Sequence, residues 1–306
     1  MNQMEWNSAT GLCKLNVRVW EPENQPPAAI LQMVHGMAEH IDRYDEFARF
    51  LASNGILVVG SDNASHGKSI SEGGSKGYFG PENGWNALIE DLRQVHESIK
   101  QAYCKIPCIL MGHSMGSFLA RSYASRYGKD MNGFIFCGTA GKNPALPLAK
   151  VIARREIKSK GLTTPSKLLD SLSFGSYNKA FRPNRTEFDW LSANEENVDR
   201  YIADENCGFV FTAAGFRDLF DGLTEIGARD WAGKVPKVPI LVIAGDKDPV
   251  GAFGKGPGEV AAKLTETGHD VILRLYEGMR HEILNETGKE AVWKDVLAFV
   301  RQSASL

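Results

Sequence analysis

One short segment, Gly112-His113-Ser114-Met115-Gly116, constrains the fold more than any other part of this 306-residue chain. It follows an apolar run at residues 106–111 and precedes residues 117–127, whose apolar side chains recur at helical spacing. A serine on a sharp turn between a strand and a helix takes strained backbone angles, so the residues two positions away must lack side chains. Gly112 and Gly116 meet that requirement. The segment therefore predicts a nucleophile elbow.

Strands and helices alternate along most of the chain. Continuous apolar runs predict buried strands over residues 28–34, 55–60, 106–111, 133–137, 239–244 and 271–276. Apolar residues spaced three and four apart predict helices over residues 44–51, 85–101, 117–127 and 289–301. This alternation is typical of an α/β protein with a mostly parallel central sheet and helices on both faces. In such sheets the chemistry lies at the carboxyl ends of the strands.

Residues 142–238 interrupt the alternation, because they hold several short helical patterns and no strong strand pattern. A segment of that length is too long for a simple loop in a compact domain. We therefore expect a core domain formed by residues 1–141 and 239–306, with residues 142–238 inserted as a helical cap over the strand ends.

Charge is unevenly distributed in this expected cap. Basic residues dominate 142–185, and acidic residues dominate 187–230. Two solvated faces that attract each other would produce this pattern. A second interpretation is that the basic segment 150–158 makes transient contact with an anionic membrane surface.

Composition excludes several classes of protein. The formal net charge of −2 argues against nucleic acid as the main partner, and the five cysteines are scattered as expected for free thiols in a reducing compartment. The chain shows no secretory leader and no apolar run near the roughly 20 residues that cross a bilayer. We expect a cytoplasmic protein, peripheral at membranes at most, with no metal and no nucleotide cofactor. Its oligomeric state and the role of Cys207 cannot be read from the sequence.

A serine nucleophile needs a base and a carboxylate, because its hydroxyl is a weak nucleophile at neutral pH. In enzymes built around this kind of elbow, the acid and then the histidine follow the serine, each on a loop after a strand. Asp246 and Asp248 both follow the strand predicted at 239–244, and His281 follows the strand predicted at 271–276. The order predicts a triad of Ser114 and His281 with one of the two aspartates.

The negative oxygen of a tetrahedral intermediate needs two backbone N–H donors. In enzymes built around such an elbow, one donor is the backbone N–H of the residue after the nucleophile, here Met115. The other donor lies on a loop after an early strand. That loop is His35-Gly36-Met37-Ala38-Glu39-His40, which makes Met37 the expected second donor. His35 is expected to anchor the loop.

Together these motifs resemble the monoglyceride lipase and lysophospholipase family of α/β-hydrolases. The residues from His35 to Tyr44 are similar to its HGxxEHxxRY stretch, and residues 62–69 are similar to its DxxGHGxS loop. The serine segment matches its GHSMG elbow, and the acid loop matches its GxxD pattern, which selects Asp248. Two positions depart from the family pattern: Ser65 and Ser117 stand where glycine is common.

The resemblance implies hydrolysis of a single-chain acyl ester, such as a lysophospholipid or a monoacylglycerol, through a covalent acyl-serine. It covers the core almost completely and the cap only loosely, so it leaves the substrate open. Esterases, thioesterases, peptidases and acyltransferases share the same triad. A non-catalytic binding module on the hydrolase fold is a further alternative.

Overall fold

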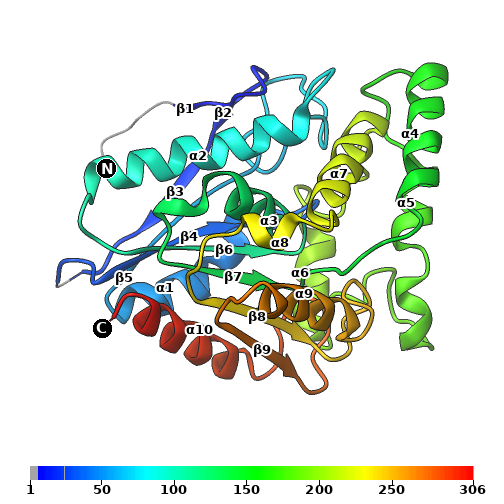
Figure 1. Ribbon diagram of the computed structural model, residues 1–306. Helices are drawn as coiled ribbons and strands as arrows, with labels where there is room; N and C mark the ends of the chain where they lie inside the picture. Colours follow the sequence, from blue (N-terminus) through cyan, green and yellow to red (C-terminus); the bar gives the residue numbers. More distant parts are fainter. Residues whose placement is uncertain (1–5, 24, 306) are drawn as a thin grey trace.

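The computed structural model describes residues 6–23 and 25–305. Seven strands form one sheet in the order β3-β5-β4-β6-β7-β8-β9 (Figure 1). The strands are Val17–Trp20 (β3), Ala29–Val34 (β4), Ile56–Ser61 (β5), Cys108–His113 (β6), Gly133–Cys137 (β7), Ile240–Gly245 (β8) and Val271–Tyr276 (β9). All neighbours pair in parallel except β3, which lies antiparallel to β5 at one edge. The predicted mostly parallel sheet is confirmed.

Helices cover both faces of this sheet. On one face pack α1 (Asp45–Ser53) and α10 (Lys289–Ser303). On the other face pack α2 (Gly84–Ala102), α3 (Met115–Tyr127) and α9 (Lys255–Glu266). Each helix carries its apolar side chains toward the sheet, so two hydrophobic cores form, one on each side.

The central strands divide their side chains between these two cores. In β4, Ile30 and Val34 belong to the core under α2 and α3, whereas Leu31 and Met33 belong to the core under α1 and α10. Successive side chains of a strand point to opposite faces, and here both faces are covered. This explains why the strands appear in the sequence as continuous apolar runs.

Between β7 and β8 the chain leaves the sheet and forms a series of helices. They are α4 (Leu146–Lys160), α5 (Lys167–Phe174), η3 (Tyr177–Phe181), α6 (Glu195–Ala203), α7 (Ala213–Ile226) and α8 (Trp231–Lys234). Figure 1 shows α4 and α5 beyond the end of the sheet, on the right of the view. The later helices α7 and α8 also contact α3. Strands β7 and β8 are nevertheless neighbours in the sheet, so this helical segment lies between two adjacent strands.

Some elements were not predicted. They are the small pair β1 (Trp6–Asn7) and β2 (Lys14–Leu15), the edge strand β3, and helix α9. The first turn of α9 contains Gly256, Pro257 and Gly258, a composition typical of loops. Proline is tolerated there because the first N–H groups of a helix have no intrahelical acceptor. Among the described residues, no helix is long and apolar enough to cross a membrane.

Candidate active site

The strained serine turn lies between β6 and α3. Ser114 has φ 53° and ψ −122°, a backbone conformation that L residues rarely adopt. A Cβ on Gly112 would lie 2.0 Å from the Gly116 carbonyl oxygen, and a Cβ on Gly116 would lie 2.2 Å from the Val34 carbonyl oxygen. Neither glycine can therefore carry a side chain, as the predicted elbow requires.

An acid and a histidine pair at the ends of two neighbouring strands. His281 Nδ1 lies 3.0 Å from Asp248 Oδ2, and both side chains are buried. The other oxygen of Asp248 accepts a hydrogen bond from Val250 N at 2.8 Å. Asp246 instead accepts a bond from Gly278 N and pairs with Lys247. Of the two aspartates that the sequence leaves open, only Asp248 contacts the imidazole.

Two backbone N–H groups beside Ser114 have no acceptor among the described residues. They belong to Met115, the first residue of α3, and Met37. The loop that carries Met37 lies against the serine, because a Cβ on Gly36 would be 3.1 Å from Ser114 Cβ. Stabilisation of an oxyanion requires two such free donors next to the nucleophile, and the oxyanion role of Met37 and Met115 stays a prediction.

Two buried imidazoles hold this loop. Asn63 N donates to His35 Nε2 at 2.8 Å, and Ala38 N donates to His66 Nε2 at 3.3 Å. Burial lowers the pKa of His66 to about 3, so its ring is neutral and able to accept this bond. The position of His35 agrees with the anchoring role expected for it.

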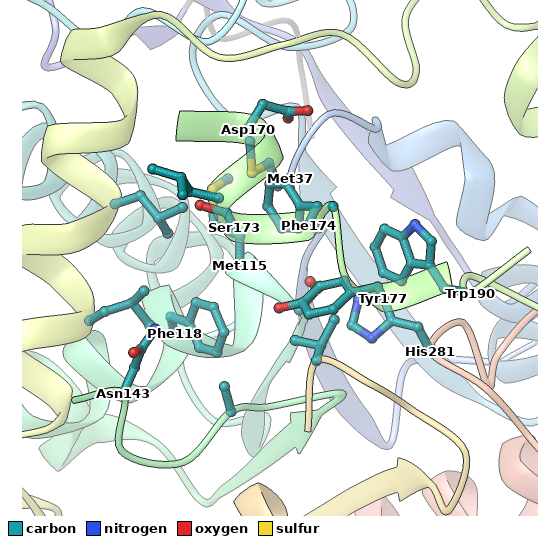
Figure 2. A pocket seen from close by; sticks show the side chains of 18 of the residues that line it. Met37, Met115, Phe118, Asn143, Asp170, Ser173, Phe174, Tyr177, Trp190 and His281 are labelled. Atoms are coloured by element: carbon teal, nitrogen blue, oxygen red, sulfur yellow. The ribbon is translucent and has the colours of Figure 1, made fainter. Parts of the chain in front are cut away.

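Ser114, His281, Met37 and Met115 line one cavity of about 850 Å³. No hydrogen bond joins Ser114 to His281 within the described part of the chain; such bonds are often long in free enzymes. Figure 2 shows Phe118 on the opposite side of this cavity from Trp190 and His281. Phe118 belongs to one hydrophobic cluster with Leu146, Leu219 and Phe220, against which Ile152 and Leu223 pack, and all six residues line the cavity. These residues form its apolar side.

The inserted segment is fastened to the histidine loop on both sides of His281. Glu282 N donates to the Leu191 carbonyl at 2.7 Å, and the Arg280 guanidinium donates to the carbonyls of Asp189 and Ser192. The buried Glu286 carboxylate accepts bonds from three backbone N–H groups, those of Ala193, Asn194 and Arg280. These contacts hold Trp190 above the imidazole, with ring centroids 5.3 Å apart.

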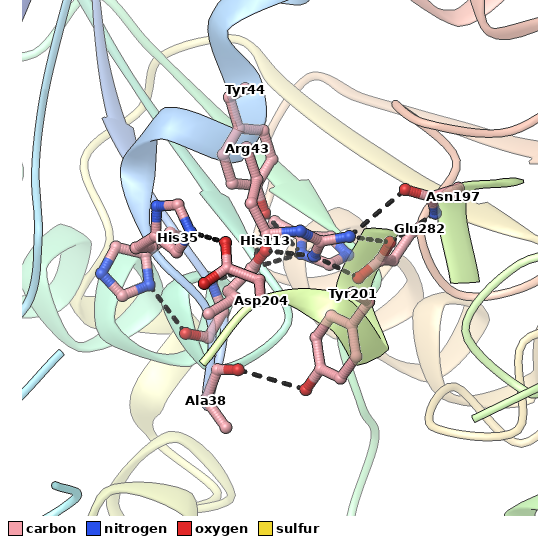
Figure 3. A network of polar contacts seen from close by, with 12 residues as sticks. His35, Ala38, Arg43, Tyr44, His113, Asn197, Tyr201, Asp204 and Glu282 are labelled. Atoms are coloured by element: carbon pink, nitrogen blue, oxygen red, sulfur yellow. Dashed lines mark hydrogen bonds and ion pairs between the residues drawn. The ribbon is translucent and has the colours of Figure 1, made fainter. Parts of the chain in front are cut away.

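A buried charged network lies behind the site (Figure 3). Glu39 accepts bonds from Gly36 N, Tyr44 Oη and Arg43, and Arg43 also binds both oxygens of Glu282. Burial alone would raise the pKa of Glu39, but the His113 hydrogen bond and the Arg43 charge hold that pKa well below its usual range. The network therefore connects the loop that carries Met37 to the loop that carries His281 through buried charges.

Two polar side chains that sequence analysis left unassigned complete this network. His113 contacts Tyr44 Oη at 2.8 Å through Nδ1 and the His281 carbonyl at 3.2 Å through Nε2. Asn197 of α6 donates to Glu282 at 2.7 Å. No local signal predicts Asn197 or Glu286, because each acts across segments far apart in the sequence.

A possible metal-binding group lies outside the cavity. Among the described residues, the ligand atoms of His40, Asp204 and Cys207 lie within 4.8 Å of one another. His40 Nε2 already binds Asp204 Oδ2 at 2.8 Å, and Cys207 is buried near Leu191 and Tyr201. The expectation that the chain holds no metal stays a prediction.

Comparison with known proteins places the chain in a family. Residues 25–288 match the family model described as "Serine aminopeptidase, S33". The monoacylglycerol lipase of Mycolicibacterium smegmatis is 28% identical, with 92% of this chain and 91% of the relative covered. Human monoglyceride lipase is 29% identical, with 88% and 80% covered. A carboxyl esterase from Bacillus coagulans superposes with a TM-score of 0.93 at 28% identity, with 98% of each chain covered.

Proposed function

The chain belongs to the serine aminopeptidase S33 family of α/β-hydrolases, and from that premise we propose that it hydrolyses carboxylic esters of single-chain acyl lipids. The names of the relatives support the broader class, a serine hydrolase of the lipase or esterase type. One observation carries the narrower proposal: the serine, the acid–histidine pair and two free N–H donors meet at a cavity with an apolar side.

The proposed reaction has two steps. Ser114 Oγ attacks the ester carbonyl carbon while His281 Nε2 takes the serine proton, and Asp248 stabilises the resulting imidazolium. The N–H groups of Met37 and Met115 bind the negative oxygen. His281 then gives its proton to the leaving alcohol as the C–O bond breaks. In the second step His281 takes a proton from water, which attacks the acyl-serine. His281 then returns that proton to Ser114 Oγ as the acyl–oxygen bond breaks and the fatty acid leaves.

The cavity supports an acyl lipid as substrate. Its volume lies within the roughly 300–1,000 Å³ of small-molecule sites, and its apolar side is formed by α3, α4 and α7. We propose that residues 142–238 act as the cap that provides most of this lining. An acyl chain on the apolar side would leave the ester carbonyl near Ser114 and the alcohol near His281.

Fatty-acid release from a substrate panel tests the proposal. The panel contains a monoacylglycerol, lysophosphatidylcholine, a diacyl lipid and short p-nitrophenyl esters, with Ser114→Ala as the blank. We expect release from the single-chain lipids and little from the diacyl lipid. Ser114→Ala should lower kcat by at least about a thousandfold while the Tm stays unchanged. Retained turnover in this folded variant would rule out Ser114 as nucleophile.

A second candidate substrate class is small soluble esters, since the carboxyl esterase from Bacillus coagulans is similar over nearly the whole chain. The same panel separates the two. Cleavage of the short esters alone would retain the triad and exclude the lipid assignment. A fluorophosphonate probe that fails to label the wild type would instead favour a non-catalytic binding module.

We further propose that α4 and α5 make transient contact with lipid surfaces. Leu148 and Leu172 are 65% and 61% exposed, and both also line the cavity. Basic residues lie on the same stretch of α4, including the exposed Arg154, Arg155 and Lys158. Co-sedimentation should be stronger with anionic than with neutral liposomes and should weaken in Leu148→Ser/Leu172→Ser. Equal failure with both kinds of liposome would exclude the contact.

A further inference from the structure

Tyr177 places a phenol in the cavity beside the histidine (Figure 2). It is the first residue of η3, and its hydroxyl has no hydrogen-bond partner within residues 6–23 and 25–305. The ring packs edge-on against Trp190, with centroids 5.2 Å apart, and Trp190 in turn lies against His281. An unpartnered donor is therefore held on the histidine side of the cavity.

The turn that carries Tyr177 is braced by the residue that follows it. Asn178 donates to the Thr186 carbonyl at 2.7 Å and accepts a bond from Trp190 N at 2.9 Å. Its own carbonyl accepts a bond from Asn184 at 2.9 Å. The Asn178 side chain thus ties the turn that carries Tyr177 to the backbone of Thr186 and Trp190. Tyr177 and Trp190 are positioned as a unit, and a positioned donor loses less entropy on binding.

The phenol is also held in its donating form. Burial and the negative charge of Asp248 raise the pKa of Tyr177 to about 12. At neutral pH the hydroxyl therefore keeps its proton.

The position of Tyr177 relative to His281 determines which part of a substrate meets the Tyr177 hydroxyl. His281 gives its proton to the leaving alcohol in the proposed reaction, so the alcohol must lie on the histidine side. The acyl chain of the ester would then occupy the apolar side of the cavity, near Phe118 and Leu219. We propose that Tyr177 donates a hydrogen bond to a hydroxyl oxygen of the leaving alcohol, and so selects esters of polyhydric alcohols such as glycerol over esters of simple alcohols. This inference rests on the proposed ester hydrolysis.

Tyr177→Phe tests the inference with two esters of one acid, 1-monolauroylglycerol and ethyl laurate. We expect kcat/KM for the glycerol ester to fall about tenfold, because one hydrogen bond is lost, and kcat/KM for the ethyl ester to change less than about twofold. Tyr103→Phe, at the far end of α2 with its hydroxyl toward Glu21, is the matched control and should leave both values unchanged. An equal loss for both esters would overturn the proposal.

A partition experiment separates recognition of the alcohol from a general structural effect. The acyl-serine formed from p-nitrophenyl laurate reacts with water or with added glycerol, and the product ratio reports how well glycerol binds. Tyr177→Phe should lower the ratio of monolaurin to laurate about tenfold and leave p-nitrophenol release unchanged. An unchanged ratio would overturn the role of Tyr177 even if the protein is an ester hydrolase. Absence of laurate release in the wild type would instead contradict the proposed hydrolysis.

Discussion

Arg43 and Glu282 form a buried, two-point ion pair across 239 residues of sequence. Arg43 Nη1 lies 2.5 Å from Glu282 Oε1, and Arg43 Nη2 lies 2.7 Å from Glu282 Oε2. Glu282 is the neighbour of His281, and Arg43 also binds Glu39, which lies on the loop that carries Met37. A planar guanidinium suits this double contact, because its N–H groups match the carboxylate oxygens. The pair therefore fixes the spacing between the two loops that the proposed reaction needs.

Arg43→Met should destabilise the protein strongly. Removal of the guanidinium leaves the carboxylates of Glu39 and Glu282 buried without their partner, which typically costs about 3–5 kcal/mol. Urea unfolding monitored by fluorescence measures this loss. Arg49→Met is the matched control, because Arg49 pairs with Asp45 on the surface, and the free energy of unfolding should hardly change. Equal stability of the two variants would show that the buried pair does not hold the loops.

Glu286 should control how firmly the inserted segment sits on the histidine loop. Glu286→Gln keeps an acceptor at one oxygen position and should cost about 1 kcal/mol. Glu286→Ala leaves the N–H groups of Ala193 and Arg280 unsatisfied, while Asn194 N keeps its bond to Ser192 Oγ, and should cost about 3 kcal/mol. The alanine variant should also be cleaved faster by proteases between residues 189 and 194. Glu290→Ala, exposed on α10, is the control. The same cleavage rate in both alanine variants would contradict this role.

The sequence predicts those features that depend on local requirements. The elbow was predictable because Gly112 and Gly116 leave no room for a Cβ, and the strands because both of their faces are buried. The choice between Asp246 and Asp248 depended on the family pattern, since both follow the same strand. Only the three-dimensional structure shows that Asp248 turns inward to His281.

Contacts between distant segments were beyond prediction. Tyr177 and Asn178 lie in an insertion without a regular pattern, and their positions depend on packing against Trp190. Glu286 gives no signal in its own neighbourhood, because its partners include residues more than 90 positions away. Neighbouring residues therefore predict the surroundings of Ser114, whereas the surroundings of His281 depend on contacts between segments that are distant in the sequence.

Ser65 occupies a left-handed turn position, with φ 63°, where the family pattern has glycine. Its hydroxyl donates to the Tyr78 carbonyl, which offsets part of the backbone cost. Ser65→Ala should lose this bond and keep the strain, for a loss of about 1–2 kcal/mol in the free energy of unfolding. Ser65→Gly also loses the bond but relieves the strain, so it should be the more stable of the two variants. Thermal unfolding of both decides the matter, and a less stable glycine variant would show that strain is negligible here.

Asp91 should make the stability of the protein depend on pH. Its carboxylate accepts bonds from Ser8 Oγ and Ala9 N, yet burial raises its pKa to about 6, above the unfolded value of 3.8. The folded state therefore binds more protons between these two values, and the free energy of unfolding falls as pH rises through that window. The loss specific to Asp91 should reach roughly 3 kcal/mol by pH 7.

Urea unfolding of the wild type and Asp91→Asn at pH 4 and pH 7 measures this effect. The variant has no carboxyl to ionise, so its stability relative to the wild type should rise between the two pH values. Ser8→Ala removes a bond that favours the charged form, so it should raise the folded-state pKa and extend the pH-dependent loss to higher pH. A constant difference between the wild type and Asp91→Asn from pH 4 to pH 7 would mean that Asp91 does not titrate in this range. The link between the N-terminal segment and α2 would then be a hydrogen bond without a pH-dependent cost.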